Sequence, residues 1–104
     1  SPTELAVNIS VEVSLNGSRT LEEVKEAFEE VLDGYYNDLI KENYALPVAN
    51  VLDNYYVSMA KVGMYLFGVD GVSDYNNLTL NGAGNVTVGP KQVPVLGTLT
   101  MTGV

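Results

Sequence analysis

The sequence predicts an α+β fold. The expected form is a two-layer sandwich, in which a three- to four-stranded, mainly antiparallel sheet carries two helices on one face in the order β-α-α-β-β. Three observations predict it: residues 5–15 alternate apolar and polar side chains, residues 20–42 repeat apolar side chains every three or four positions, and residues 71–97 contain two apolar runs around a turn. The chain has 104 residues, 46% of them hydrophobic, so one core and a single domain over residues 1–104 are expected.

Residues 5–15 have the most regular pattern in the chain. Apolar residues occupy every odd position from Leu5 to Leu15, and Ala, Asn, Ser and Glu occupy the positions between them. Side chains of a strand point alternately to its two faces, so this pattern predicts a strand with one buried and one solvated face. The polar far side indicates that helices cover only one face of the sheet. Asn16-Gly17 predicts a turn after this strand.

A capping box opens the helix that is expected over residues 20–42. The Thr20 hydroxyl can accept the backbone N–H of Glu23, while the Glu23 carboxylate reaches back to the cap. The residues that follow place acids on the side opposite one apolar stripe, which comprises Leu21, Val24, Phe28, Val31, Leu32, Tyr35 and Leu39. Gly34 predicts a kink or an early end, because glycine costs about 1 kcal/mol relative to alanine inside a helix.

The middle of the chain combines a loop and a short helix. Residues 43–57 are expected to form a loop that ends in a short extended piece, because Pro47 prevents a continuous helix and Asn50 and Asp53-Asn54 favour turns. Ser58 is expected to cap a second helix that runs to about residue 67. Most of its apolar side chains are expected to be buried, namely Met59, Val62, Met64, Leu66 and Phe67.

Residues 71–97 predict two strands joined by a turn at Asn81-Gly82, since both residues tolerate the positive φ of tight hairpin turns. The three-residue spacing from Gly82 to Asn85 favours a longer, bulged loop over a two-residue turn. An extended tail over residues 93–101 is expected to follow, with Pro90 and Pro94 placing parts of it at an edge or bulge. The apolar residues of the two strands are Tyr75, Leu78, Leu80, Val86 and Val88.

The composition limits the kinds of partner and reaction that the chain can have. The chain has no Cys and no His, and its 13 acidic and five basic residues give a net charge of −8. This balance disfavours nucleic acid and an anionic membrane surface as partners, because both require positive charge. No helix-length apolar run and no signal peptide are visible.

No catalytic, cofactor-binding or metal-binding residue is predicted, and no small-molecule substrate is expected. The carboxylate pairs of residues 20–42 are interpreted as a solvated helix face. Asp70, Asp74 and Asn76 lack the spacing of a calcium loop, and Ser58 with Lys61 matches S-x-x-K without its partner motifs.

The seven tyrosines are the remaining signal. Tyr35 and Tyr36 are adjacent, as are Tyr55 and Tyr56. Neighbouring residues of a helix or strand do not all face one core, so at least one of each pair is expected to be partly exposed. Exposed tyrosine favours protein interfaces, so these four residues are candidate contacts. The alternative is that they line the margin of a small core with solvated hydroxyls.

The end of the chain also carries a resemblance, in a series of residues that occur in order: Gly71, Val72, Tyr75, Leu78, Leu80, Asn81, Gly82, Asn85, Pro94 and Gly97. This series resembles the C-terminal end of the baseplate J-like proteins of contractile phage tails. Comparable elements precede it at residues 7–15, 20–25 and 57–63. Residues 44–54 have no counterpart, and Met59-Ala60-Lys61 stands where an Arg or Lys before a hydrophobic residue and Gly is usual.

The resemblance implies a structural function. It predicts that the chain, which begins with Ser1 rather than Met, is the C-terminal part of a longer wedge protein, held in the virion tail baseplate and assembled in the host cytoplasm. Its expected partners are other baseplate and tail proteins and itself, with the edge of the predicted hairpin and the tyrosine pairs as contacts. An alternative from the Tyr, Asn and Thr content is a surface-exposed adhesin or carbohydrate-binding module. A small hydrolase or transferase would instead require a deep pocket of convergent carboxylates.

Overall fold

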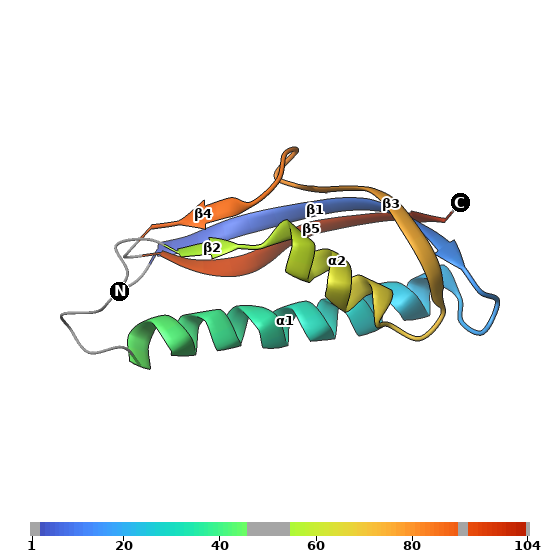
Figure 1. The fold of residues 1–104 in the computed structure, drawn as a ribbon, viewed down its shortest axis with the longest axis horizontal. Coiled ribbons are helices and arrows are strands. Elements are labelled where there is room, and N and C mark those ends of the chain that lie inside the picture. The colour runs from blue at the N-terminus through green and yellow to red at the C-terminus, as the bar shows by residue number, and fades with distance from the viewer. Residues whose placement is uncertain (1–2, 46–54, 90–91, 104) are drawn as a thin grey trace.

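The computed structural model describes residues 3–89 and 92–103, apart from 46–54 (Figure 1). Within these residues, two helices and five strands follow one another, which confirms the α+β class. They are β1 (Thr3–Leu15), α1 (Leu21–Ala45), β2 (Tyr55–Val57), α2 (Met59–Phe67), β3 (Val72–Leu80), β4 (Val86–Val88) and β5 (Gln92–Gly103). Strands β1 and β5 and helix α1 run along the long axis of the molecule (Figure 1).

The main sheet has three strands in the order β3-β1-β5. β3 pairs with β1 antiparallel, whereas β5 pairs with it in parallel, with Leu5 opposite Pro94 and Ile9 opposite Leu99. The expected mainly antiparallel sheet is therefore wrong, and the sheet is mixed. The expected extended tail is a strand of 12 residues. Pro94 lies on this outer strand, as predicted, where its missing N–H does not interrupt an inner ladder.

The turn at Asn81-Gly82 forms, but it does not join a pair of neighbouring strands. Leu80 and Ala83 exchange backbone hydrogen bonds at 3.0 and 3.4 Å around Asn81 (φ 51°) and Gly82 (φ 77°), so a two-residue turn replaces the expected bulged loop. The chain then leaves β3, and β4 pairs antiparallel with β2 in a second, two-stranded sheet. The predicted pairing of the two strands is wrong because β2 supplies a partner that lies far away in sequence.

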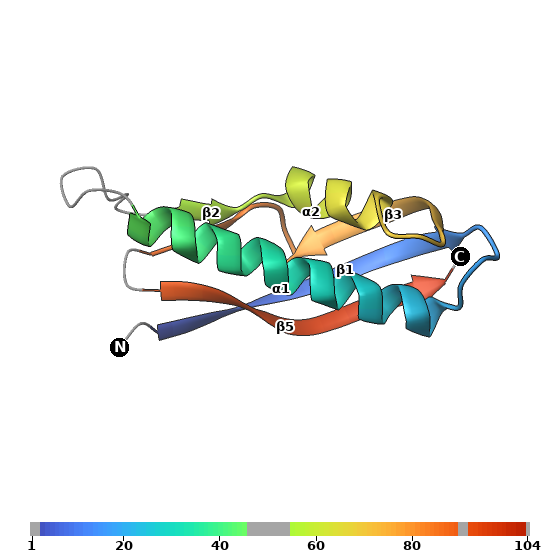
Figure 2. The same ribbon diagram turned by 90° about the horizontal axis from the view of Figure 1, so that it is seen from below.

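Both helices lie on one face of the sheet, as expected (Figure 2). The odd-numbered positions of β1 from Val7 to Val13 are buried, which confirms the alternating strand. They belong to one core with apolar side chains from both helices, the other four strands and the loop after α2, namely Val24, Phe28, Leu32, Tyr35, Tyr36, Val57, Val62, Leu66, Val69, Val72, Leu80, Val88 and Leu99.

Helix α1 begins with the predicted capping box. The Thr20 hydroxyl accepts the N–H of Glu23 at 3.2 Å, and the Glu23 carboxylate accepts the N–H of Thr20 at 3.0 Å. The Glu23 carboxylate also accepts the Thr20 hydroxyl at 3.1 Å. The two hydrogen bonds that this carboxylate accepts hold the pKa of Glu23 below its usual value, the bond from the Thr20 backbone contributing most.

The helix continues for 25 residues to Ala45, so the predicted early end at Gly34 is wrong, and α1 runs without a sharp bend in Figure 1. The expected loop is therefore wrong for residues 43–45, which belong to α1, and residues 46–54 of this prediction lie outside the described residues. The short extended piece at its end is confirmed as β2.

The two helical glycines predict substitutions of opposite sign. A Cβ at Gly34 would meet nothing within 4 Å, so we expect Gly34→Ala to raise the free energy of unfolding by about 1 kcal/mol through helix propensity. A Cβ at Gly63 would overlap the hydroxyl of Tyr75, so Gly63→Ala is expected to lower it by about 1–2 kcal/mol. Urea denaturation measures both. Tyr75→Phe in the Gly63→Ala background should recover part of the lost stability. If Gly34→Ala and Gly63→Ala changed the free energy of unfolding in the same direction, the packing described for these two glycines would be contradicted.

Candidate interaction surface

Helix α2 is apolar around most of its circumference, and only one side of it is buried. The Ser58 hydroxyl accepts the N–H of Lys61 at 3.2 Å, which confirms the predicted N-cap. Val62 and Leu66 face the core, whereas Met64 and Phe67 are 59% and 54% exposed. The expectation that these last two are buried is wrong, because Met64 lies about 200° around the helix from Val62.

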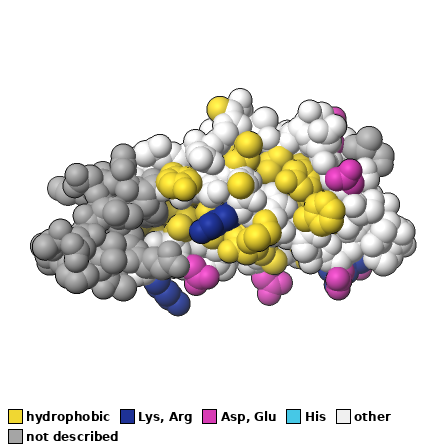
Figure 3. Space-filling model, viewed as in Figure 1, with side chains coloured by type: hydrophobic (Ala, Val, Ile, Leu, Met, Phe, Trp, Pro, Cys, Tyr) yellow, Lys and Arg dark blue, Asp and Glu magenta, His cyan; other side chains and the backbone are white. Residues whose placement is uncertain are grey.

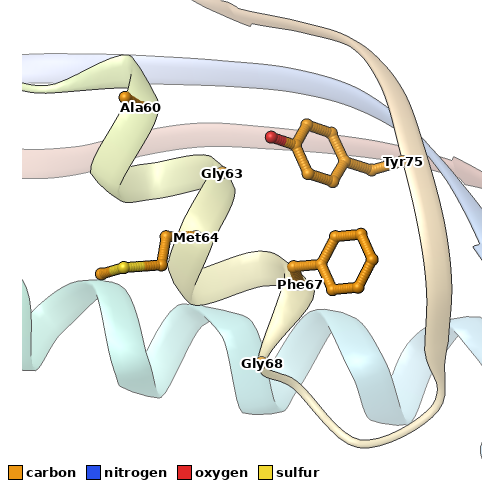
Figure 4. Close-up of a pocket in the computed structure, with 6 residues that line it drawn as sticks. All are labelled: Ala60, Gly63, Met64, Phe67, Gly68 and Tyr75. Atoms are coloured by element: carbon orange, nitrogen blue, oxygen red, sulfur yellow. The ribbon is translucent and has the colours of Figure 1, made fainter.

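Met64 and Phe67 line an open hollow of about 580 Å³ together with Ala60, Gly63, Gly68 and Tyr75. Figure 4 shows the Phe67 and Tyr75 rings side by side, one from α2 and one from β3. Their centroids are 6.2 Å apart at an interplanar angle of 76°, an edge-to-face contact. Gly63 permits this approach, since any larger residue would meet Tyr75. We call the exposed side chains of Met64 and Phe67, with the ring of Tyr75, the α2 patch.

A second hollow, of about 390 Å³, lies between α1 and α2 and shares Met64 with the first. Val31 of α1, which is 38% exposed, lines it along with Ala27, Tyr65 and Val69. Arg19 and Asp70 also line it and form an ion pair at 3.9 Å. Apolar side chains gather over this part of the molecule, with acidic side chains below them (Figure 3). Exposed apolar side chains therefore lie on α2 and on the neighbouring side of α1, with Met64 between the two hollows.

The tyrosine pairs do not behave as predicted. Tyr35 and Tyr36 are both buried, so the expectation that one of them is exposed is wrong. α1 packs against α2 as well as against the sheet, and two neighbouring positions of the helix can both be enclosed. Tyr56 is 54% exposed, as expected for one member of its pair, and the side chain of Tyr55 lies outside the described residues. Of the four candidate contacts, Tyr56 is the one that presents a described, exposed side chain.

The two buried hydroxyls differ in their hydrogen bonding. The Tyr35 hydroxyl accepts the N–H of Ser58 at 3.0 Å, and its ring lies 5.1 Å from the ring of Tyr65, which ties α1 to the start of α2. The Tyr36 hydroxyl is buried with no hydrogen-bond partner among the described residues. Burial raises the pKa of both, and for Tyr36 the neighbouring Tyr35 and Asp33 raise it further.

The glycines and asparagines of residues 71–97 shape the backbone. Gly71 adopts φ 102° where a Cβ would press on Arg19 and Val24, and its carbonyl accepts the N–H of Asn16 at 2.9 Å. Asn85 accepts the N–H of Met59 at 2.8 Å and so ties the loop after the turn to the start of α2. Gly97 lies against Asn8, where β5 bulges and the Asn8 side chain accepts the N–H of Thr98 at 2.8 Å.

The apolar residues of the same series pack. Val72 and Leu80 are buried, and Tyr75 and Leu78 are partly buried against the core. Pro94 is also buried, at the outer strand of the sheet. The series therefore lies in β3, in β5 and in the turn and loops beside them, and Asn85 connects it to the start of α2.

A family model of the Baseplate J-like protein C-terminal domain matches residues 7–102 of the chain. The chain belongs to this family. A search of curated proteins gives no match. Membership in the baseplate J-like family gives the chain a structural role in the bacteriophage tail baseplate, in contact with other tail proteins, and the family is not a known enzyme family.

The polar groups that were considered for chemistry have local roles in this baseplate J-like domain. Ser58 and Lys61 form the helix cap described above. The Asp74 and Asn76 side chains accept the N–H of the next residue at 2.9 Å each. In the part of the chain that the structure describes, no three acidic side chains gather as a metal site would require. None of the described helices combines the length and the hydropathy that a membrane crossing needs.

Reasoning from the sequence missed the exposed side of α2. The available signal was composition, because Met59–Phe67 has Lys61 as its one charged residue. A helix that is apolar on all sides is usually enclosed on all sides. In this domain the sheet and α1 enclose only part of it, so the remainder is open to a neighbour.

Proposed function

We propose that this chain is a docking and assembly domain of a wedge protein in a contractile phage tail baseplate. The observation that supports it is the α2 patch, an exposed apolar surface at the centre of a domain from a baseplate family. Its partners are other baseplate subunits, and the domain acts in the assembled virion tail after assembly in the host cytoplasm. The domain comprises residues 1–104 and forms the C-terminal part of a longer protein.

The physical reason is the free energy of burying apolar side chains. Fully enclosing a Phe or Met side chain that was open to water contributes about 1.5–3 kcal/mol, and Met64 and Phe67, which are 59% and 54% exposed, can each supply roughly half of this on docking. Met64 and Phe67 are one turn apart on α2, so a single partner surface covers both. The edge-to-face contact with Tyr75 holds Phe67 in place before a partner arrives, which reduces the entropy lost on docking.

The test compares tails assembled with the wild-type baseplate protein and with its Met64→Ser/Phe67→Ser variant. We expect the variant to enter tail particles at less than about a tenth of the wild-type level, because it loses the apolar contribution of both side chains. Quantitative mass spectrometry of purified particles measures the incorporation.

The matched control is Asp33→Ser/Asp38→Ser, which changes two exposed positions of α1 that line neither hollow. It should assemble normally. Both variants replace exposed residues, so both should keep their thermal transition. Normal incorporation of a folded Met64→Ser/Phe67→Ser variant would refute docking through the α2 patch, and Tyr56→Ser then tests the exposed tyrosine of β2 in the same assay.

A further inference from the structure

Strand β5 forms an outer edge of the main sheet, and no described strand pairs with its far side. It runs for 12 residues, from Gln92 to Gly103, and contains no charged side chain. Along residues 98–103, where no described strand pairs with the outer side, backbone N–H and C=O groups can pair with another chain. Figure 2 shows β5 along the margin of the sheet, with the first turns of α1 beside its C-terminal end.

The other outer strand, β3, is protected against such pairing. Asp74 is exposed on it, and its ladder with β1 is irregular near Asn77, which has φ 53°. Charges and an irregular backbone are among the usual ways in which proteins prevent edge pairing.

In β5 the features that hinder edge pairing lie only in the first half of the strand. Pro94 lacks an N–H, and the bulge lies where Asn8 faces Gly97 and Thr98. Residues 98–103 then read Thr-Leu-Thr-Met-Thr-Gly, a run of strand-forming residues with no proline and no charge. Thr100 and Thr102 are exposed, Leu99 is buried and Met101 is partly buried.

We propose that residues 98–103 of β5 bind an extended segment of another protein, which adds a fourth strand to the sheet. The segment alternates apolar residues, which lie on the side of Leu99 and α1, with polar residues on the side of Thr100. Its polar positions include Lys or Arg, because the chain carries a net charge of −8 and the exposed acids nearest this edge, Glu22 and Glu26, lie on the first turns of α1, whose Leu21 is beside Gly103. These negative charges attract a cation from the opposite side of the sheet edge, within a Debye length of about 10 Å.

Charge separates this partner from a second copy of the chain. The chain carries a net charge of −8, so two copies that meet along this edge bring like charges together. A basic segment is instead attracted by the negative charge of the chain. The proposal concerns a surface other than the α2 patch, and its outcome does not depend on docking through that patch.

The experiment uses the chain and two synthetic peptides of nine residues, one repeating Lys-Val-Thr-Val and ending in Lys, and one with Glu in place of each Lys. In the free protein, alternate amides of residues 98–103 should exchange rapidly with solvent. Hydrogen exchange followed by NMR should show them protected when the Lys peptide binds. The Glu peptide should bind at least about tenfold more weakly.

Thr100→Lys/Thr102→Lys places charges on the edge itself and should abolish protection by the Lys peptide. Thr3→Lys/Thr87→Lys makes the same change at exposed threonines of β1 and β4, so it is the matched control and should bind normally. Absence of protection at residues 98–103 would overturn the proposal. Protection that rises with protein concentration in the absence of peptide would also overturn it, because a second copy would then occupy the edge. The peptide experiment and the tail incorporation of the Met64→Ser/Phe67→Ser variant are independent, so failure of one proposal leaves the other standing.

Discussion

Replacing Phe28 with Ala is expected to lower the free energy of unfolding by about 3–5 kcal/mol. Phe28 is fully buried, at 0% exposed, on the side of α1 that faces the sheet. Its removal deletes the apolar contacts of a whole ring and leaves a cavity that the surrounding β-branched residues of β1 fill poorly. Urea denaturation followed by circular dichroism measures the change.

Val31→Ala is the matched control, three residues further along the same helix. Val31 is 38% exposed beside the hollow between the helices, so its truncation should cost less than about 1 kcal/mol. Both residues belong to the apolar stripe that the sequence predicts for this helix, and only the packing of α1 separates them. Equal losses for the two variants would show that α1 does not face the sheet as described.

The features that were predicted correctly depend on neighbours in sequence. The alternation along β1, the capping box at Thr20 and the cap at Ser58 each involve residues within a few positions of one another. The physical causes of these features, which are side-chain direction and unpaired N–H groups, act locally. A short pattern therefore contains most of what determines them.

The features that were not predicted depend on partners distant in sequence. β5 pairs with β1 across more than eighty residues, and its parallel direction has no signature in either strand alone. β4 pairs with β2 and not with β3, although the Asn81-Gly82 turn itself forms as its residues dictate. The choice between available edges is made by the whole fold, which local patterns do not encode.

The candidate site was predicted only in part for the same reason. The sequence identified Tyr56 as an interface candidate, together with the buried Tyr35 and Tyr36, but it placed Met64 and Phe67 in the core. Whether a residue of α2 is exposed depends on where α1 and β3 stop covering that helix. The role of Asn85 at the start of α2 likewise requires a loop to meet a helix that lies 26 positions earlier.

The second large loss of stability is expected at Asn81, which connects the end of β3 to β1. Asn81 accepts the N–H of Asn8 through its side-chain oxygen at 2.7 Å and donates from its side-chain nitrogen to the Ala6 carbonyl at 3.3 Å. Its own N–H donates to the Asn8 carbonyl at 2.7 Å. The Asn81 side chain thus continues the ladder toward the start of β1 at the point where the chain turns away from it.

Asn81→Ala is expected to lower the free energy of unfolding by about 2–3 kcal/mol, from two lost side-chain hydrogen bonds and a left-handed backbone that alanine adopts poorly. Asn81→Gly separates the two causes, because glycine tolerates the φ of 51° but makes neither side-chain bond, so about half the loss should remain. Asn81→Asp keeps the acceptor for Asn8 and loses the donor to Ala6. The order of stability expected from urea denaturation is therefore wild type, then Asp and Gly, then Ala. An Ala variant as stable as the Gly variant would show that the positive φ contributes nothing to this requirement for asparagine.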